Sequence, residues 1–295
     1  MRQTLADRIF DGINYTFLAF CLLVVGYPLI YIVSASFSSA QAVVAGKVWL
    51  WPVDVTLDAY EAIFKSPRIG SGYLNSLIYA QLGTAINIVM TTLAAFPLSR
   101  RDWYGRGFFT AILVFTMLFS GGLIPTYLLV KQLGMLNTRW AMVIPNAYGV
   151  WYVILMRTYF QSNIPEEMYE AAQLDGCRDG QFLTRIVLPL SAPIMAVMVL
   201  FYAVGHWNAY FDALIYLSKT ELMPLQIVLR DILVQNQFDP AMLQGIDVRE
   251  WGRLQNLRDL LKYALIVVAS APVLAIYPFV QRYFIRGIMV GALKG

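Results

Sequence analysis

The sequence lacks the common motifs for metal-dependent, nucleophilic and nucleotide chemistry. The 295-residue sequence contains a single histidine, His206, whereas a His-Glu-x-x-His zinc motif needs two. The Gly-x-Ser-x-Gly elbow of serine hydrolases does not occur. The glycine-rich end, 287–295, lacks the Gly-Lys-Ser/Thr of a phosphate-binding loop. The sequence therefore argues against an enzyme, and against a metal or nucleotide site in this chain.

The remaining candidates are polar side chains that lie inside apolar runs. Polar groups are costly to bury in lipid, so their default interpretation is functional. Several of them combine aromatic rings with hydrogen-bonding groups, and sugar binding needs both properties. Two alternatives stay open: hydrogen bonds between helices, worth about 1 kcal/mol each, and aromatic anchoring at a membrane interface. The candidates for a substrate path are Asn75, Gln81, Asn87, His206, Trp207, Asn208, Tyr210 and Asp212.

The elements that position these side chains are predicted to be membrane helices. Charged residues make up only 14% of the chain and the mean hydropathy is +0.59, whereas a soluble domain carries about 25% charged residues. A bilayer core requires about 20 apolar residues per helix. The sequence therefore predicts an all-α membrane protein with one permease domain over residues 1–295. Its six predicted spans are 13–34, 74–98, 107–130, 140–160, 191–217 and 263–284.

The first span and the charge distribution determine the predicted topology. Arg2 and Arg8 precede the first apolar run, as in a signal peptide. The run is longer than the ~7–15 residues of a signal-peptide core, so we interpret it as an uncleaved helix. The short segment 99–105 carries Arg100 and Arg101, and short loops rich in Lys and Arg stay in the cytoplasm. This predicts a multi-pass protein of the bacterial inner membrane with both termini cytoplasmic.

The most polar segment between spans, residues 161–190, is predicted to form two short helices around a turn. Pro165 suits the start of a helix, where its missing N–H costs nothing. Gly176 is free to adopt positive φ and to end that helix. A second helix is expected over about 179–187, with Pro189 as its end. A surface helix pair with a partly apolar face usually has a partner.

This segment resembles the EAA loop of binding-protein-dependent ABC permeases. That loop reads Glu-Ala-Ala, three residues, Gly, then a spaced apolar residue and Pro. The resemblance implies a type I ABC importer permease fold. It also implies that the segment is the coupling helix, which docks into a cleft of the ATPase subunit, and that Glu170 pairs with an ATPase arginine. The residues that match are Glu170, Ala171, Ala172, Asp175, Gly176, Ile186 and Pro189.

Other stretches resemble the maltose-permease-like branch, which imports sugars. The similarity is closest to permeases for polysaccharides and complex oligosaccharides, including uronic-acid polymers such as alginate. The stretches that carry it are Trp51-Pro52, Asn75-Ser76-Leu77, Gly121–Tyr127 and Leu136-Asn137-Thr138. In that branch the C-terminal end inserts between the ATPase subunits, which implies the same role for the tail 285–295. The residues concerned are Gly291, Ala292, Leu293, Lys294 and Gly295.

The resemblance also implies the partners of this chain. These are a homologous second permease, two ATPase subunits that bind ATP and Mg²⁺, and an extracytoplasmic sugar-binding protein. The chain itself would hold no cofactor, and it would couple ATP hydrolysis to alternating access. Two other interpretations stay open. One is an ion-coupled secondary transporter, for which Asp212 and His206 are the only candidate pair. The other is a membrane scaffold without transport activity.

Overall fold

The computed structural model describes residues 4–233, 260–278 and 281. Within these ranges every regular element is a helix, so the predicted all-α fold is confirmed. The chain divides into two units, the first comprising residues 1–70 and 229–272 and the second 71–228 and 273–295.

The first unit contains the N-terminal helices and most of the described part of the last apolar helix. Thr4 caps the first helix: its hydroxyl accepts a hydrogen bond from the Asp7 N–H, and the Asp7 carboxylate accepts one from the Thr4 N–H. Within the same unit the hydroxyls of Ser36 and Tyr60 lie 2.8 Å apart. Its elements are α1 (Leu5–Ser36), α2 (Ala40–Val44), α3 (Asp58–Lys65) and the apolar helix Leu260–Pro278, most of which belongs to this unit.

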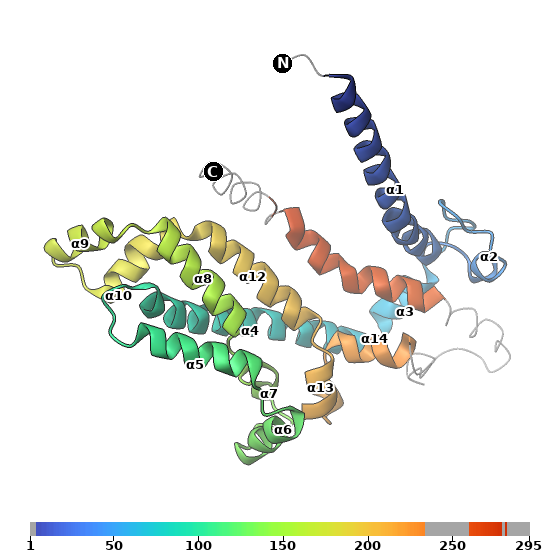
Figure 1. The fold of residues 1–295 in the computed structure, drawn as a ribbon. Coiled ribbons are helices and arrows are strands. Elements are labelled where there is room, and N and C mark those ends of the chain that lie inside the picture. Colours follow the sequence, from blue (N-terminus) through green and yellow to red (C-terminus); the bar gives the residue numbers. More distant parts are fainter. Residues whose placement is uncertain (1–3, 234–259, 279–280, 282–295) are drawn as a thin grey trace. The chain divides into compact units, whose positions relative to one another are not determined.

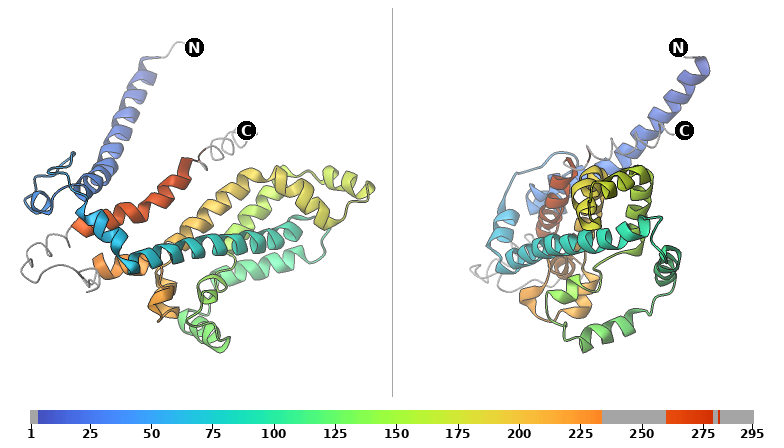
Figure 2. Two further views of the ribbon diagram at one scale, coloured as in Figure 1. Left: turned by 180° about the vertical axis from the view of Figure 1, so that it is seen from behind. Right: turned by 90° about the vertical axis from the view of Figure 1, so that its left-hand side faces the viewer.

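The second unit is a helical bundle built around α4 (Pro67–Ser99), which begins in the first unit. Figures 1 and 2 show α5, α8 and α12 beside α4, with α9 and α10 at one end of this bundle and α6, α7 and α13 at the other. The elements that follow α4 are α5 (Arg106–Leu118), α6 (Leu123–Gln132), α7 (Trp140–Val143), α8 (Val150–Asn163), α9 (Glu166–Leu174), α10 (Asp179–Phe182), the π-helical turn Leu183–Val187, α11 (Leu188–Leu190), α12 (Ala192–Trp207), α13 (Phe211–Tyr216), the 3₁₀ turn Thr220–Leu222 and α14 (Leu225–Leu233).

Within the described ranges, three single helices are long and apolar enough to cross a membrane: Asp7–Ser36, Pro67–Ser99 and Leu260–Pro278. They coincide with the described parts of the first, second and last predicted spans. Two bent helix pairs also qualify, namely α5 with α6, at 110°, and the helical run Asp179–Leu190 with α12, at 83°. The count of six spans stays a prediction.

The other three predicted spans are interrupted. Gly121 and Gly122 separate α5 from α6, and Gly122 has a φ of 84°, which a continuing helix cannot accommodate. Between α7 and α8 the chain leaves the helix over 144–149, which contains Pro145. A third break, at 208–210, separates α12 from α13. Each break gives the chain a place to change direction within an otherwise apolar run.

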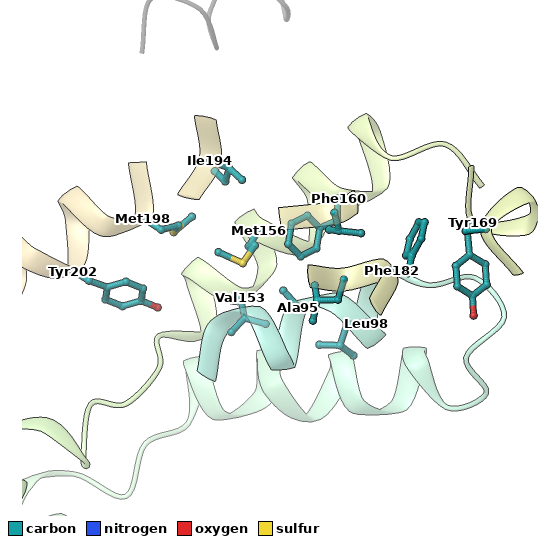
Figure 3. Close-up of a cluster of buried hydrophobic side chains, with 13 residues drawn as sticks. Ala95, Leu98, Val153, Met156, Phe160, Tyr169, Phe182, Ile194, Met198 and Tyr202 are labelled. Carbon is teal, nitrogen blue, oxygen red and sulfur yellow. The ribbon is translucent and has the colours of Figure 1, made fainter. Parts of the chain in front are cut away.

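The principal hydrophobic core extends from the bundle into the helix pair at its end (Figure 3). Phe182 of α10 is only 1% exposed, and its ring lies 5.0 Å from that of Tyr169 in α9. Ala95 and Leu98 at the end of α4 belong to the same cluster. Its other members are Val153, Met156, Phe160, Ala172, Leu183, Val187, Ile194, Met198 and Tyr202. The helix pair is therefore packed against the bundle and can move with it.

Candidate functional site

The first helix of the 161–190 segment ends as its sequence predicts. Asp175 follows the last helical residue, and Gly176 adopts a φ of 75°. The Gly176 N–H donates to Gln173 O and the Cys177 N–H donates to Ala172 O, both at 2.9 Å. This pair of bonds is a Schellman motif, in which a glycine without a Cβ satisfies the last carbonyls of a helix. The turn fixes the direction in which α9 presents its residues.

The second helix does not end at Pro189, so that prediction is wrong. The helical path runs from Asp179 through the π-helical turn and α11 to Leu190. The Leu188 N–H donates to Leu183 O, five residues back, which widens the turn. Pro189 lies within this helical path, which ends one residue later at Leu190.

The residues singled out in this segment divide between an exposed and a buried face. Glu170, Ala171, Asp175, Gly176 and Pro189 are exposed. Ala172 is buried, and Ile186 packs against the main core. The candidate residues therefore do not form one surface, and those on the buried face position the others.

Leu174 is a surface residue that the sequence analysis missed. Its side chain is 90% exposed at the end of α9, and it lies one helical turn after Glu170. A large apolar side chain that is almost fully exposed on a short surface helix is suited to a partner's pocket. The detectable signal was a leucine four positions after Glu170, directly before the turn residues Asp175 and Gly176.

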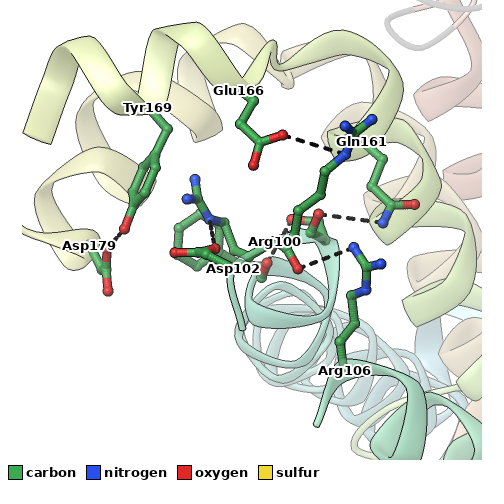
Figure 4. A network of polar contacts seen from close by, with 10 residues as sticks. Arg100, Asp102, Arg106, Gln161, Glu166, Tyr169 and Asp179 are labelled. Atoms are coloured by element: carbon green, nitrogen blue, oxygen red, sulfur yellow. Dashed lines mark hydrogen bonds and ion pairs between the residues drawn. The ribbon is translucent and has the colours of Figure 1, made fainter. Parts of the chain in front are cut away.

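A network of polar contacts ties α9 to α10 and to the loop after α4 (Figure 4). The Tyr169 hydroxyl donates to Asp179 Oδ1 at 2.6 Å, and the Arg100 guanidinium lies over the Tyr169 ring. Asp102 Oδ1 accepts a hydrogen bond from Arg100 Nε at 3.2 Å. The hydrogen bond to Asp179 and partial burial raise the pKa of Tyr169, so its hydroxyl remains a donor at physiological pH. The Tyr169 side chain therefore connects α9 with α10 and with the loop after α4.

Replacing Tyr169 by phenylalanine should loosen this connection without emptying the core. The ring stays, and the hydrogen bond to Asp179 is lost, at a cost of about 1 kcal/mol. Hydrogen exchange of the 166–182 backbone in the assembled transporter should become faster. The control is Tyr104→Phe, because the Tyr104 side chain is fully exposed. Equal exchange in the two variants would contradict a role for the Tyr169 hydroxyl.

The polar residues inside the apolar runs are mostly engaged in hydrogen bonds within the bundle. Asn75 Nδ2 donates to Glu221 O at 2.7 Å and to Met223 O at 3.2 Å, which fixes the 3₁₀ turn against α4. Asn87 Nδ2 donates to Asn146 O at 2.6 Å. For Asn75 and Asn87 the geometry favours the structural alternative.

His206 belongs to the same network. His206 Nε2 lies 2.5 Å from Asn87 Oδ1, and Asn146 Nδ2 donates to Asp212 Oδ2 at 2.9 Å. His206 and Asp212 are therefore connected only through two asparagines. The secondary-transporter interpretation would require an ion pair between them, and among the described residues no ion pair joins them.

The remaining candidates for the substrate path differ in how exposed their side chains are. Trp207 is buried, with its ring edge-on to Tyr73 at 5.4 Å. Asn208, Tyr210 and Gln81 are exposed. Of the eight candidate path residues, these three present their side chains most openly.

In the described ranges, no group of three or more His, Cys, Asp or Glu side chains is placed to hold a metal ion. The predicted tail residues, Gly291–Gly295, lie outside the described residues.

The second unit is a helical bundle with a helix pair packed on its end, and several helices of the described chain are apolar enough to cross a membrane. The chain belongs to the family of binding-protein-dependent transport system inner membrane components, whose model matches residues 87–290. It is 41% identical to the polygalacturonan/rhamnogalacturonan transport system permease protein YtcP of Bacillus subtilis (strain 168), over 98% of this chain and 99% of the relative. Protein LplC of the same organism is 37% identical, over 100% of this chain and 98% of the relative.

A solved structure supports the same fold. It is described as a bacterial ABC transporter involved in the import of the acidic polysaccharide alginate. One of its chains is 34% identical and superimposes with a TM-score of 0.86, covering 96% of this chain and 99% of that chain. The protein is accordingly a non-catalytic, multi-pass permease subunit of an ABC importer in the inner membrane. The ion-coupled secondary transporter and the inert scaffold are set aside.

Proposed function

We propose that this permease carries polysaccharide fragments that contain uronic acid, driven by ATP that partner subunits bind and hydrolyse with Mg²⁺. The substrate class is supported by two relatives. One is named for polygalacturonan and rhamnogalacturonan, and the other is described as an importer of the acidic polysaccharide alginate. Polygalacturonan and alginate share uronic-acid units. Similarity over nearly the full length supports the same class of substrate here.

The observation that carries the mechanism is the exposed face of α9. Glu170, Ala171 and Leu174 combine a carboxylate, a small surface and an apolar side chain within five residues. The Schellman turn and the buried Phe182 hold this face in a fixed orientation. We assign it to docking in a cleft of the ATPase subunit, with Glu170 paired to a cation there. Closure of two ATPase subunits would then move α9 and, through the shared core, α4, α8 and α12.

This assignment determines the proposed topology. Docking on an ATPase requires α9 and the 161–190 segment to lie in the cytoplasm. An even number of spans would then place both termini on the same side. The tail 285–295 would reach the ATPase subunits, as the resemblance implies, and a binding protein would deliver the sugar from outside. Pairing with a homologous permease completes the pathway.

For the sugar path, Gln81, Asn208 and Tyr210 are the best-placed candidates because their side chains are exposed. Replacing Asn208 by alanine should reduce substrate-stimulated ATPase activity and leave basal activity unchanged. Trp207→Ala should lower both activities, because it removes a buried ring from its contact with Tyr73. The measurement is ATPase activity of the reconstituted transporter with and without loaded binding protein. Equal losses in both activities for Asn208→Ala would make that residue structural.

The substrate class is tested with the same reconstituted transporter. Its binding protein is loaded in turn with oligogalacturonate, alginate oligomers and neutral maltooligosaccharides. The proposal predicts ATPase stimulation by the uronic-acid sugars only. Stimulation by the neutral sugars alone would contradict it.

A further inference from the structure

A cavity of about 550 Å³ opens at the end of the bundle where α9 begins. Four arginines line it, together with Glu166 and Glu167. They come from the loop after α4, the first residue of α5 and the middle of α8: Arg100, Arg101, Arg106 and Arg157. The cavity is distinct from the exposed face of α9.

Two of these arginines already have carboxylate partners. Arg100 pairs with Asp102 at 3.2 Å and Arg101 with Glu166 at 3.5 Å. Arg106 and Arg157 do not: within the described ranges neither lies within ion-pair distance of a carboxylate.

In the part of the chain that the structure describes, the hydrogen bonds of these two arginines go to backbone oxygens. Arg106 Nη1 donates to Arg100 O at 3.3 Å, and Arg157 Nε donates to Leu98 O at 3.0 Å. Each guanidinium has five N–H donors in a fixed fork, so most of their donors remain available.

The positions of Arg106 and Arg157 are electrostatically unfavourable without an anion. Both are partly buried, and they line the same cavity, so their like charges share one enclosed site. Bringing like charges together away from water costs free energy, and a bound anion would offset this cost. A phosphate matches the donor geometry, because the guanidinium fork binds its oxygens in pairs.

The surroundings of the cavity indicate where this phosphate comes from. Beyond Arg106, α5 presents Phe108, Ile112 and Phe115 as an exposed apolar stripe at helical spacing. Tyr104, two residues before Arg106 in the sequence, is fully exposed. Aromatic side chains of this kind are typical of the headgroup level of a bilayer. The helix that supplies Arg106 therefore also exposes apolar side chains, and an arginine-lined cavity beside such a helix suits a molecule with an anionic head and hydrocarbon chains.

We propose that the cavity binds the phosphate of an anionic phospholipid through Arg106 and Arg157, while the acyl chains lie along α5. The lipid would sit beside α9 and the Arg101–Glu166 pair. It would therefore stabilise the end of the bundle that carries the docking face. The proposal requires only that the helices cross a membrane.

The test uses the assembled transporter in nanodiscs of phosphatidylcholine alone or mixed with phosphatidylglycerol. Lipid retained after detergent exchange is identified by native mass spectrometry. Wild type should retain phosphatidylglycerol, and Arg106→Gln with Arg157→Gln should bind it about tenfold more weakly for each arginine replaced. Arg185→Gln, which removes an exposed arginine of the π-helical turn outside the cavity, should retain it.

A second variant covers the case in which the double variant does not fold. Arg106→Lys keeps the charge and should retain part of the binding. The proposal is overturned if phosphatidylcholine is retained as well as phosphatidylglycerol, or if both arginine variants retain lipid like wild type. If inorganic phosphate alone displaces the bound phosphatidylglycerol, the cavity binds a free anion, and the lipid proposal is overturned. If the arginine variants lose the ATPase subunits but retain lipid like wild type, the cavity binds an acidic protein segment. That outcome would also overturn the proposal.

Discussion

Replacing Glu170 by alanine should abolish ATP-driven uptake while the permease still folds and inserts. The side chain is exposed on α9 and belongs to no hydrophobic core cluster of the described chain, so its loss leaves the bundle intact. At the proposed ATPase interface, the same change leaves a buried cation without its partner. This costs about 2–5 kcal/mol of binding free energy, or at least about thirtyfold in affinity for the ATPase subunit. The measurements are co-purification of the ATPase subunits and ATP-dependent uptake into vesicles.

The controls for this variant separate charge from shape. Glu170→Gln keeps the side-chain volume and should recover little, because the cation stays unpaired. Glu61→Ala removes an exposed carboxylate from α3, where its partner is Lys65 in the next turn, and it should leave uptake unchanged. Wild-type uptake by Glu170→Ala would refute the assignment of α9.

Gly83→Ala should be the most damaging glycine substitution in α4. A Cβ built on Gly83 would overlap the ring of His206. That ring is buried and bonded to Asn87, so it has little room to withdraw. Overpacking of this kind costs about 1–3 kcal/mol. We expect a lower Tm and a lower yield of folded permease in detergent.

Gly70→Ala is the matched control, because it lies in the same helix and a Cβ there meets no atom within 4 Å. It should be neutral or stabilising, since alanine favours a helix over glycine by up to about 1 kcal/mol. Adding His206→Ala to Gly83→Ala should restore part of the lost stability, as expected for two residues in contact. If Gly83→Ala and Gly70→Ala shift Tm equally, the close packing of α4 and α12 is wrong.

The parts of the fold that the sequence predicts correctly depend on local chemistry. The turn after α9 follows from Asp175 and Gly176, because only a few bonds within one turn determine it. The end of the second helix depends on a π-helical turn, which packing sets. Pro189 therefore gave the wrong boundary.

For the polar residues inside the apolar runs, the sequence identifies the residues but not their partners. Their cost in lipid identifies Asn87 and His206 as important, but only the fold shows that they bond to each other across α4 and α12. The arginine cavity was not predictable either. Arg106 and Arg157 are 51 positions apart in the sequence and meet only when α5 packs on α8. Leu174 is exposed because α9 turns its other face to the core, a fact that its own residue type does not reveal.

The most direct test of the account is a cross-link between α9 and the ATPase subunit. Leu174 is replaced by cysteine in a chain whose native Cys21 and Cys177 are serine, and the assembled transporter is treated with a short bifunctional thiol reagent. The account predicts a covalent product with an ATPase subunit whose yield changes when ATP is added, and none from a cysteine at Phe115 on the apolar stripe of α5. A cross-link from Phe115→Cys and none from Leu174→Cys would contradict it.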